Sequence, residues 1–513
     1  LHFIADNPEF VSHGQNAAEY REAAEQFDGL VQKSMDGAPE PLNLRHRMSG
    51  CNYAVGLRHQ LAISSVAMMA TATGKKIPER LIGTAIKETM THEVGHTLGL
   101  RHNFKASAWL SLEEIRQRRD NTDEPISSSV MDYNALLFFP GDDIEKVRHF
   151  ANPAIGPYDY WVIEYGYRTP AREDGSEAAM LAKIASRSPE KALAYLTDED
   201  VVGTTSVDPD ANRWDMTSDP LEWAKIRIAL ADSLLKDIKS WAVRADGPNH
   251  ELRGYFSTVM FEKVRNLQYV SRLVGGQYHS RNRSGDPEAR PALQIVEPAR
   301  QREAMKLIGE TILSDSFFNF EPALLNDLVA TRWSDFAGRA PSRVDFPVHQ
   351  TILNMQNLTL MNLVSPAVLQ RIYDAEMKSA AEDKYTAAEH LSLLRATIFG
   401  DLKAPQQQVT DAKPFISSIR RNLQMQYLSY MLAAAESQPG ALMSADLQSM
   451  VRFSMRDLGN QIEALLKAGK LDLASRAHLT EAKNRIDRVL NVPAQLVPGT
   501  AGATITIGAE PAN

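Results

Sequence analysis

Residues 91–103, THEVGHTLGLRHN, hold three histidines, one glutamate and two glycines. His92 and His96 are four residues apart, slightly more than one helical turn, so on a helix both imidazoles leave the same face. Two neutral imidazoles at that separation can share one divalent ion. The competing interpretation is a helix end whose histidines lie on a solvated face. The rest of the stretch favours the metal.

The second glycine and the third histidine complete the pattern. Gly99 comes three residues after His96, and glycine often ends a helix because it enters the left-handed region without strain. The chain can then turn back and bring His102 to the same ion. Three protein nitrogens leave one coordination position open, as in catalytic zinc sites. We therefore predict one zinc ion per chain, bound by His92, His96 and His102.

Glu93 follows the first histidine directly. It lies about 100° further round the helix, too far to be an easy third ligand, but its carboxylate can reach a water at the ion. A carboxylate there can take a proton from the water and pass it to a leaving amine. Glu93 is thus the predicted catalytic base of a peptidase. Two alternatives remain: a non-peptidase interaction protein that binds zinc, and a metallohydrolase that acts on non-peptide substrates.

Three motifs carry a resemblance to a known group of enzymes. HEVGHTLGLRH (92–102) matches H-E-x-x-H-x-x-G-x-x-H and resembles the metzincin metallopeptidases. SVMDY (129–133) resembles their methionine turn, and GPYDYWVIEYGY (156–167) resembles the helix that closes their catalytic domain. The resemblance implies that Met131 lies under the metal and that Tyr133 supports the transition state. A plain packing role is the alternative for Tyr133.

The wider likeness is to the large bacterial, exported zinc-dependent metallopeptidases of uncharacterised-domain type. It implies a peptide or protein substrate and a periplasmic, outer-membrane-associated or secreted location. Asn103 differs from the residue usual in the better-known branches, and the calcium-binding repeats of the serralysins are absent from the sequence. Substrate preferences are therefore not carried over.

Composition narrows the classes of protein. The chain has 513 residues, 43% of them hydrophobic and 23% charged. Its net charge of −8 argues against a nucleic-acid-binding protein, which typically has an excess of basic residues. No apolar run approaches the roughly 18 residues that span a membrane. The single cysteine, Cys51, excludes an internal disulfide, and we assign it a packing role rather than a latency switch. His46 and His59 are expected to be structural or surface residues.

The predicted fold is mainly α, α+β overall, with a metzincin-like zinc helix and methionine turn followed by a large helical domain. Residues 103–157 read as loops. Helices are predicted over residues 14–36, 55–73, 78–99, 158–166, 221–245, 251–274, 299–313, 349–379, 385–399, 412–436, 444–468 and 471–490. Because the residues before His92 read as helices and loops, we expect much of the N-terminal metzincin sheet to be missing and to be supplied by a preceding segment. A short sheet within residues 1–50 is the alternative.

The predicted organisation has four parts. Residues 1–170 form the catalytic region, 171–220 an acidic junction, 221–490 the helical domain and 491–513 a flexible tail. Within the junction, residues 197–220 read as a solvated acidic loop, with a calcium site as the alternative. GGQYHSRNR (275–283) reads as a surface loop or as part of a substrate cleft. No pattern indicates an oligomeric state.

Overall fold

A computed structural model describes residues 53–71, 79–203, 206–243, 250–330, 343–402, 409–436 and 443–491. Four predicted features lie outside the described residues: the helix over residues 14–36, His46, Cys51 and residues 492–513 of the tail. The expectation that much of the N-terminal sheet is missing therefore stays a prediction for residues 1–52 and 72–78.

Helices make up most of the described chain. They are α4 (Tyr53–Thr71), α5 (Glu79–Thr97), α6 (Leu112–Asn121), α7 (Pro157–Tyr167), α8 (Glu177–Ala185), α9 (Pro220–Lys236), α10 (Ile238–Ala242), α11 (His250–Ser271), α12 (Pro298–Glu310), α13 (Pro322–Asp327), α14 (Val348–Val364), α15 (Pro366–Lys378), α16 (Ala387–Phe399), α17 (Ser418–Glu436), α18 (Ala445–Ala468) and α19 (Leu473–Asn491). In the same residues, the strands β1 (Gln277–His279) and β2 (Leu293–Ile295) form one antiparallel pair. The prediction of a mainly α fold is confirmed.

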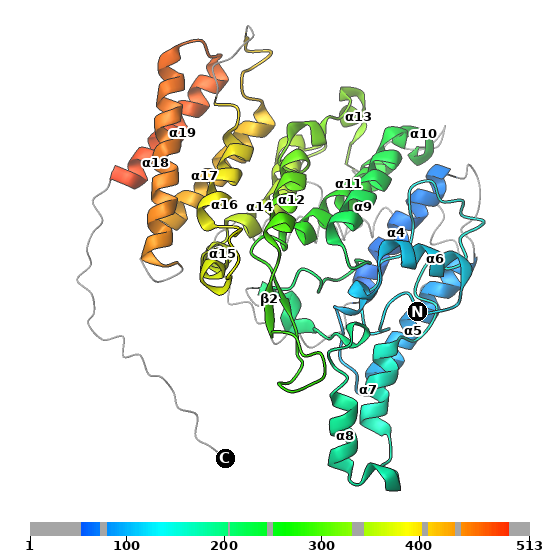
Figure 1. Cartoon of the computed structure of the whole chain (residues 1–513). Coiled ribbons are helices and arrows are strands. Elements are labelled where there is room, and N and C mark those ends of the chain that lie inside the picture. Colours follow the sequence, from blue (N-terminus) through cyan, green and yellow to red (C-terminus); the bar gives the residue numbers. More distant parts are fainter. Residues whose placement is uncertain are drawn as a thin grey trace, which may run out of the picture.

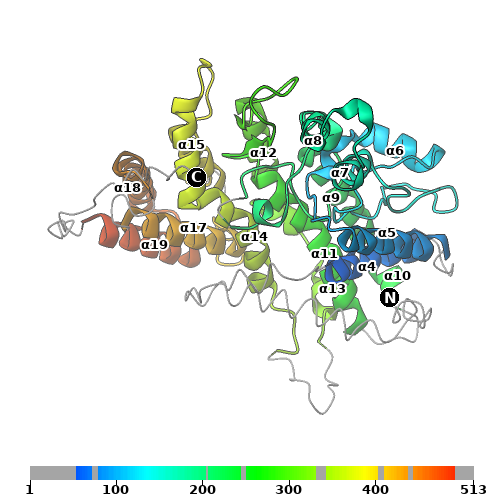
Figure 2. The ribbon, with the colours of Figure 1, turned by 90° about the horizontal axis from the view of Figure 1, so that it is seen from below.

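The helices run across the molecule roughly in chain order. Helices α4 to α8 lie at one end and α17 to α19 at the other, with α9, α11, α12 and α14 between them (Figures 1 and 2). No helix within the described ranges is long and apolar enough to cross a membrane.

Helices α9 and α11 join the two ends of the molecule. The largest apolar core contains Leu221 of α9 and Phe256 of α11 and extends through the C-terminal helices as far as Leu490. A second core contains Leu230 of α9 and Val259 of α11, together with residues of α4, α5 and the segment 136–151. Because each of these two helices contributes to both cores, the catalytic region and the helical region share their supporting elements.

A buried ion cluster fixes α4 to this pair of helices. Glu262 of α11 accepts hydrogen bonds from His59 Nε2 at 2.9 Å and from Arg227 Nε at 2.6 Å. Arg227 of α9 also donates to the Phe138 carbonyl oxygen at 3.1 Å. Burial would raise the pKa of Glu262, but Arg227 and His59 hold it well below its usual value. His59 is thus structural, as expected.

The predicted helix 221–245 is wrong, because the structure divides it into α9 and α10 at Asp237. Two further predicted segments are also wrong. The segment 103–157 contains α6, which begins at a capping box: Ser111 Oγ accepts from Glu114 N at 3.3 Å, and Ser111 N donates to Glu114 Oε2 at 2.8 Å. The predicted helix 349–379 is two helices, because Pro366 has no amide hydrogen to continue the first one. In both cases the deciding residue is visible in the sequence.

Candidate metal centre

Helix α5 carries the first two histidines and ends in a tight turn. Leu100 N donates to the Gly95 carbonyl oxygen at 3.1 Å, and Gly99 N donates to that of His96 at 3.0 Å. Gly99 has φ +82°, the left-handed conformation that closes a Schellman motif. The reversal at Gly99 brings the chain back, and His102 with it, toward α5, as the spacing predicted.

The structure brings the three predicted ligands together. The ligand atoms of His92, His96 and His102 all lie within 4.8 Å of one another. In the part of the chain that the structure describes, this is the one group of three or more histidine, cysteine, aspartate or glutamate side chains close enough to hold a metal ion.

Each of the three rings has a hydrogen-bond acceptor at its Nδ1 atom. The distances are 2.7 Å from His92 Nδ1 to the Val130 carbonyl oxygen, 2.9 Å from His96 Nδ1 to that of Leu100, and 2.9 Å from His102 Nδ1 to Asp198 Oδ2. Because a carbonyl or carboxylate oxygen only accepts, each Nδ1 carries the proton. Each Nε2 then presents a lone pair, which is the arrangement found around metal-bound imidazoles.

The protonation and burial of the rings fit a divalent cation. His96 Nε2 is buried and has no hydrogen-bond partner in the structure, a state that buried nitrogens rarely keep without a ligand. Burial lowers the pKa of His92 to about 3, so this ring is neutral at ordinary pH. Three neutral imidazole nitrogens are a donor set that suits zinc.

Met131 packs against α5 at Gly95, the residue before His96. Its side chain is fully buried, and a Cβ atom added to Gly95 would lie 2.2 Å from Met131 Sδ. The Met131 carbonyl oxygen accepts from Asn103 N at 2.9 Å. The methionine turn is therefore in contact both with the helix that bears two ligands and with the chain just after the third.

Asp159 of α7 holds the methionine turn in place. Its Oδ1 accepts from Ser129 Oγ at 2.6 Å, and its Oδ2 accepts from Val130 N at 2.9 Å and Gly156 N at 2.8 Å. Val130 in turn orients His92 through its carbonyl oxygen. The segment 156–167 thus supports the first ligand by way of the turn, a role that its sequence did not reveal.

Tyr133 lies beside the third ligand. Its hydroxyl is 3.1 Å from His102 Nε2, the nitrogen available to a metal. Its ring contacts those of Tyr53, Phe104 and Trp214 at centroid distances of 5.2, 5.0 and 5.3 Å. Tyr133 is therefore packed among aromatic rings and also lies next to the third predicted ligand.

Glu93, the predicted base, occupies the helix position next to His92. It is half-buried, and the group of converging ligand atoms does not include it. This agrees with the geometric argument that its carboxylate is too far round the helix to be a ligand.

Asp198 is a residue of the centre that the sequence analysis missed. Its carboxylate binds His102 and has Arg213 Nη2 at 3.3 Å and Arg101 Nη2 at 3.9 Å. Burial would raise its pKa, but the hydrogen bond from His102 and the two arginines bring the pKa of Asp198 below its usual value. The anion therefore persists and keeps the proton on His102 Nδ1. Nothing in local spacing signals this pair, because the two residues are 96 positions apart.

The acidic stretch 197–220 is not a solvated loop where the structure describes it. Asp208 and Asp215 are buried. Asp215 accepts from Asn212 Nδ2 at 2.9 Å and from Ser107 Oγ at 3.2 Å, and burial raises its pKa to about 6. These two carboxylates bind protein groups, and no three acidic side chains in the described part of this stretch converge.

Comparison with known proteins gives one match. The Met-zincin family matches residues 74–406, which is more than half of the chain and includes the zinc helix and the methionine turn. No curated protein and no solved structure matches the chain. With three converging histidines, a buried methionine packed against the helix that carries two of them, and this match, the chain belongs to the Met-zincin family of zinc-dependent metallopeptidases.

Proposed function

We propose that this protein hydrolyses peptide bonds in peptide or protein substrates, using a single zinc ion bound by His92, His96 and His102. The observation that carries the proposal is the shared orientation of the three rings. Each Nδ1 is occupied by an acceptor, and the ligand atoms converge within 4.8 Å.

His92, His96 and His102 would hold a zinc ion, which would supply Lewis acidity to polarise a carbonyl and lower the pKa of a bound water. Glu93 takes the proton from the attacking water and delivers it to the leaving amine nitrogen. The Tyr133 hydroxyl, 3.1 Å from His102 Nε2, would donate a hydrogen bond to the carbonyl oxygen as negative charge develops there.

The direct test is turnover of a mixed peptide library, followed by mass spectrometry. We expect cleavage by the zinc-loaded protein, loss of cleavage after removal of zinc with a chelator, and recovery when zinc is returned. Cleavage that persists in metal-free protein would contradict the mechanism. A fully zinc-loaded protein that cleaves no peptide would leave the two non-peptidase alternatives.

A ligand variant provides the control for the site. We expect His96→Ala to lose both zinc and turnover, because a site with two imidazoles binds zinc weakly. His349→Ala is the matched control, since this histidine is exposed and bonds to Ser418 of α17. It should keep both properties.

A further inference from the structure

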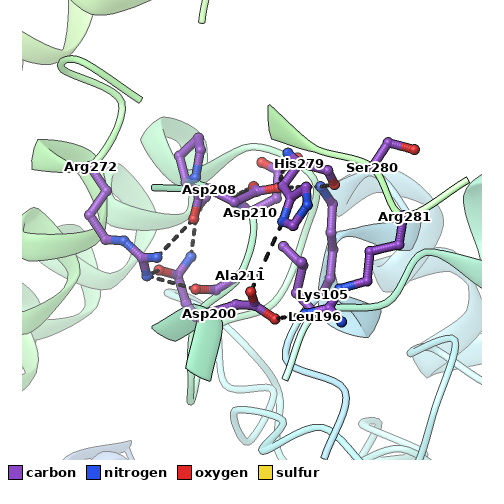
Figure 3. Close-up of polar contacts among 12 residues, drawn as sticks. Lys105, Leu196, Asp200, Asp208, Asp210, Ala211, Arg272, His279, Ser280 and Arg281 are labelled. Atoms are coloured by element: carbon purple, nitrogen blue, oxygen red, sulfur yellow. Dashed lines mark hydrogen bonds and ion pairs between the residues drawn. The ribbon is translucent and has the colours of Figure 1, made fainter. Parts of the chain in front are cut away.

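The hairpin formed by β1 and β2 follows α11 in the chain but contacts the segment around residues 195–200, which carries Asp198. Arg281 Nη2 donates to Asp200 Oδ2 at 2.7 Å, and His279 Nδ1 lies 4.0 Å from Asp200 Oδ1 (Figure 3). The Arg281 guanidinium also lies over the ring of Tyr195, 5.4 Å from its centroid. The stretch 275–283 is therefore attached to the segment around residue 200 instead of standing free as a surface loop.

The segment that the hairpin contacts carries Asp198. The short helix η5 (Asp198–Val201) begins with this residue. Asp200 stabilises the start of this short helix, because its Oδ2 accepts a hydrogen bond from Thr197 N at 2.8 Å. The same carboxylate oxygen thus binds the start of the turn and Arg281, two residues from the carboxylate that orients His102.

A second attachment of the hairpin involves the chain just after His102. Lys105, three residues after His102, forms an ion pair with the buried Asp208 and donates to the His279 carbonyl oxygen at 3.2 Å (Figure 3). Asp208 Oδ2 also accepts from His279 N at 2.7 Å. The hairpin is therefore fixed to the chain that carries the ligand and to the turn that carries the ligand's partner.

We propose that the β1–β2 hairpin is part of the metal centre and that Arg281 is a positioning residue, which sets metal affinity by holding Asp198 against His102. This inference rests on the proposed function, since it requires metal at the three histidines. Partners that hydrogen-bond to a metal-bound histidine change metal affinity by about 10- to 100-fold when they are removed. Arg281 does not bind that partner itself but reaches it through a partly exposed ion pair with Asp200, two residues along the chain, so we expect its loss to weaken zinc binding about threefold to tenfold.

The test measures zinc affinity of the full chain by competition with a chromophoric chelator. Arg281→Ala should bind zinc about threefold to tenfold more weakly than the unmodified protein, and Arg281→Lys should fall between them because it keeps the charge but not the forked geometry. Arg283→Ala is the matched control, since Arg283 is an exposed arginine of the same hairpin that bonds to Asp286 through its backbone nitrogen. It should bind zinc normally.

Thermal unfolding of the metal-free variants separates positioning from general damage. We expect Arg281→Ala and Arg283→Ala to unfold within a few degrees of the unmodified protein, since both side chains are exposed. Equal zinc affinity in these two variants would overturn the inference while leaving the proposed function intact. Failure of the unmodified protein to bind zinc would instead overturn the proposed function.

Discussion

The three histidines are oriented by two kinds of acceptor, backbone carbonyls for His92 and His96 and a carboxylate for His102. A carboxylate partner carries full charge, so it raises the basicity of its imidazole more than a carbonyl does. His102 is therefore the ligand whose basicity depends on another side chain, that of Asp198, and a substitution can test this dependence.

This difference leads to a prediction for Asp198. Asp198→Asn keeps an acceptor for His102 Nδ1 but removes the charge, so zinc affinity should fall about 10- to 100-fold. Competition with a chelator measures it. An unchanged zinc affinity would mean that the charge of Asp198 has no part in metal binding.

Gly95 makes a second prediction at the scale of single residues. An added Cβ would lie 2.2 Å from Met131 Sδ, so Gly95→Ala should destabilise the protein by about 1–3 kcal/mol and weaken zinc binding. Gly83→Ala on the same helix is the control: nothing lies within 4 Å of its Cβ position, and it should stabilise by up to about 1 kcal/mol. Denaturant unfolding of both variants compares them. Equal effects would show that the contact under α5 is not tight.

The sequence predicted the ligands but not their supports, and the reason is physical. His92, His96, Gly99 and His102 are related by the period of a helix and the turn that ends it, so local spacing predicts their convergence. Asp198 and Asp159 reach the centre through tertiary folding. A carboxylate in an acidic stretch carries no local sign of the histidine or backbone nitrogen that it will meet.

At the scale of elements, the ion cluster at Glu262 joins α4, α9 and α11. Glu262→Gln would leave Arg227, which is fully buried, without its counter-charge. We expect a loss of about 3–5 kcal/mol in unfolding free energy, as for other broken buried ion pairs. Urea unfolding at neutral pH measures it. A loss below about 1 kcal/mol would contradict the assigned role.

The same carboxylate has a pH signature. In the folded protein the pKa of Glu262 is lowered from its ordinary value of 4.5. The contribution of Glu262 to the free energy of unfolding is therefore fully present above about pH 4.5, and it is lost as the pH falls through the lowered pKa. The unfolding free energy should therefore decline below about pH 4.5, and less steeply in Glu262→Gln. Parallel acid profiles would contradict this.

The elements themselves were predicted well where apolar periodicity is strong and poorly where a single residue decides. Helices α5 and α11 follow the predicted ranges closely. Pro366 divides α14 from α15, and Ser111 with Glu114 begins α6 inside a stretch that otherwise reads as loop. Periodicity averages over a window and therefore passes over a proline or a cap.

At the scale of the whole molecule, α9 and α11 belong to both apolar cores. Elements that share their core residues unfold together, so we expect one cooperative transition rather than separate ones for the catalytic and helical regions. The predicted four-part organisation stays a prediction. Calorimetry of the whole chain, which shows whether there is one transition or several, bears on it.

Zinc binding should stabilise this unit as a whole. At zinc concentrations about 100 times the dissociation constant, the gain is about 2.7 kcal/mol, which should move the entire calorimetric transition upward. Two transitions, with zinc moving the first and leaving the second in place, would show instead that the helical region is independent of the metal centre.

The central claim is that zinc on His92, His96 and His102 acts together with Glu93 in peptide hydrolysis. The most direct test is the peptide turnover of Glu93→Gln at matched zinc content. Because the variant keeps the three ligands and loses only the proton acceptor, we predict full zinc occupancy and a fall in turnover of about 10²- to 10⁴-fold. Turnover close to that of the unmodified protein, at equal zinc content, would contradict the account.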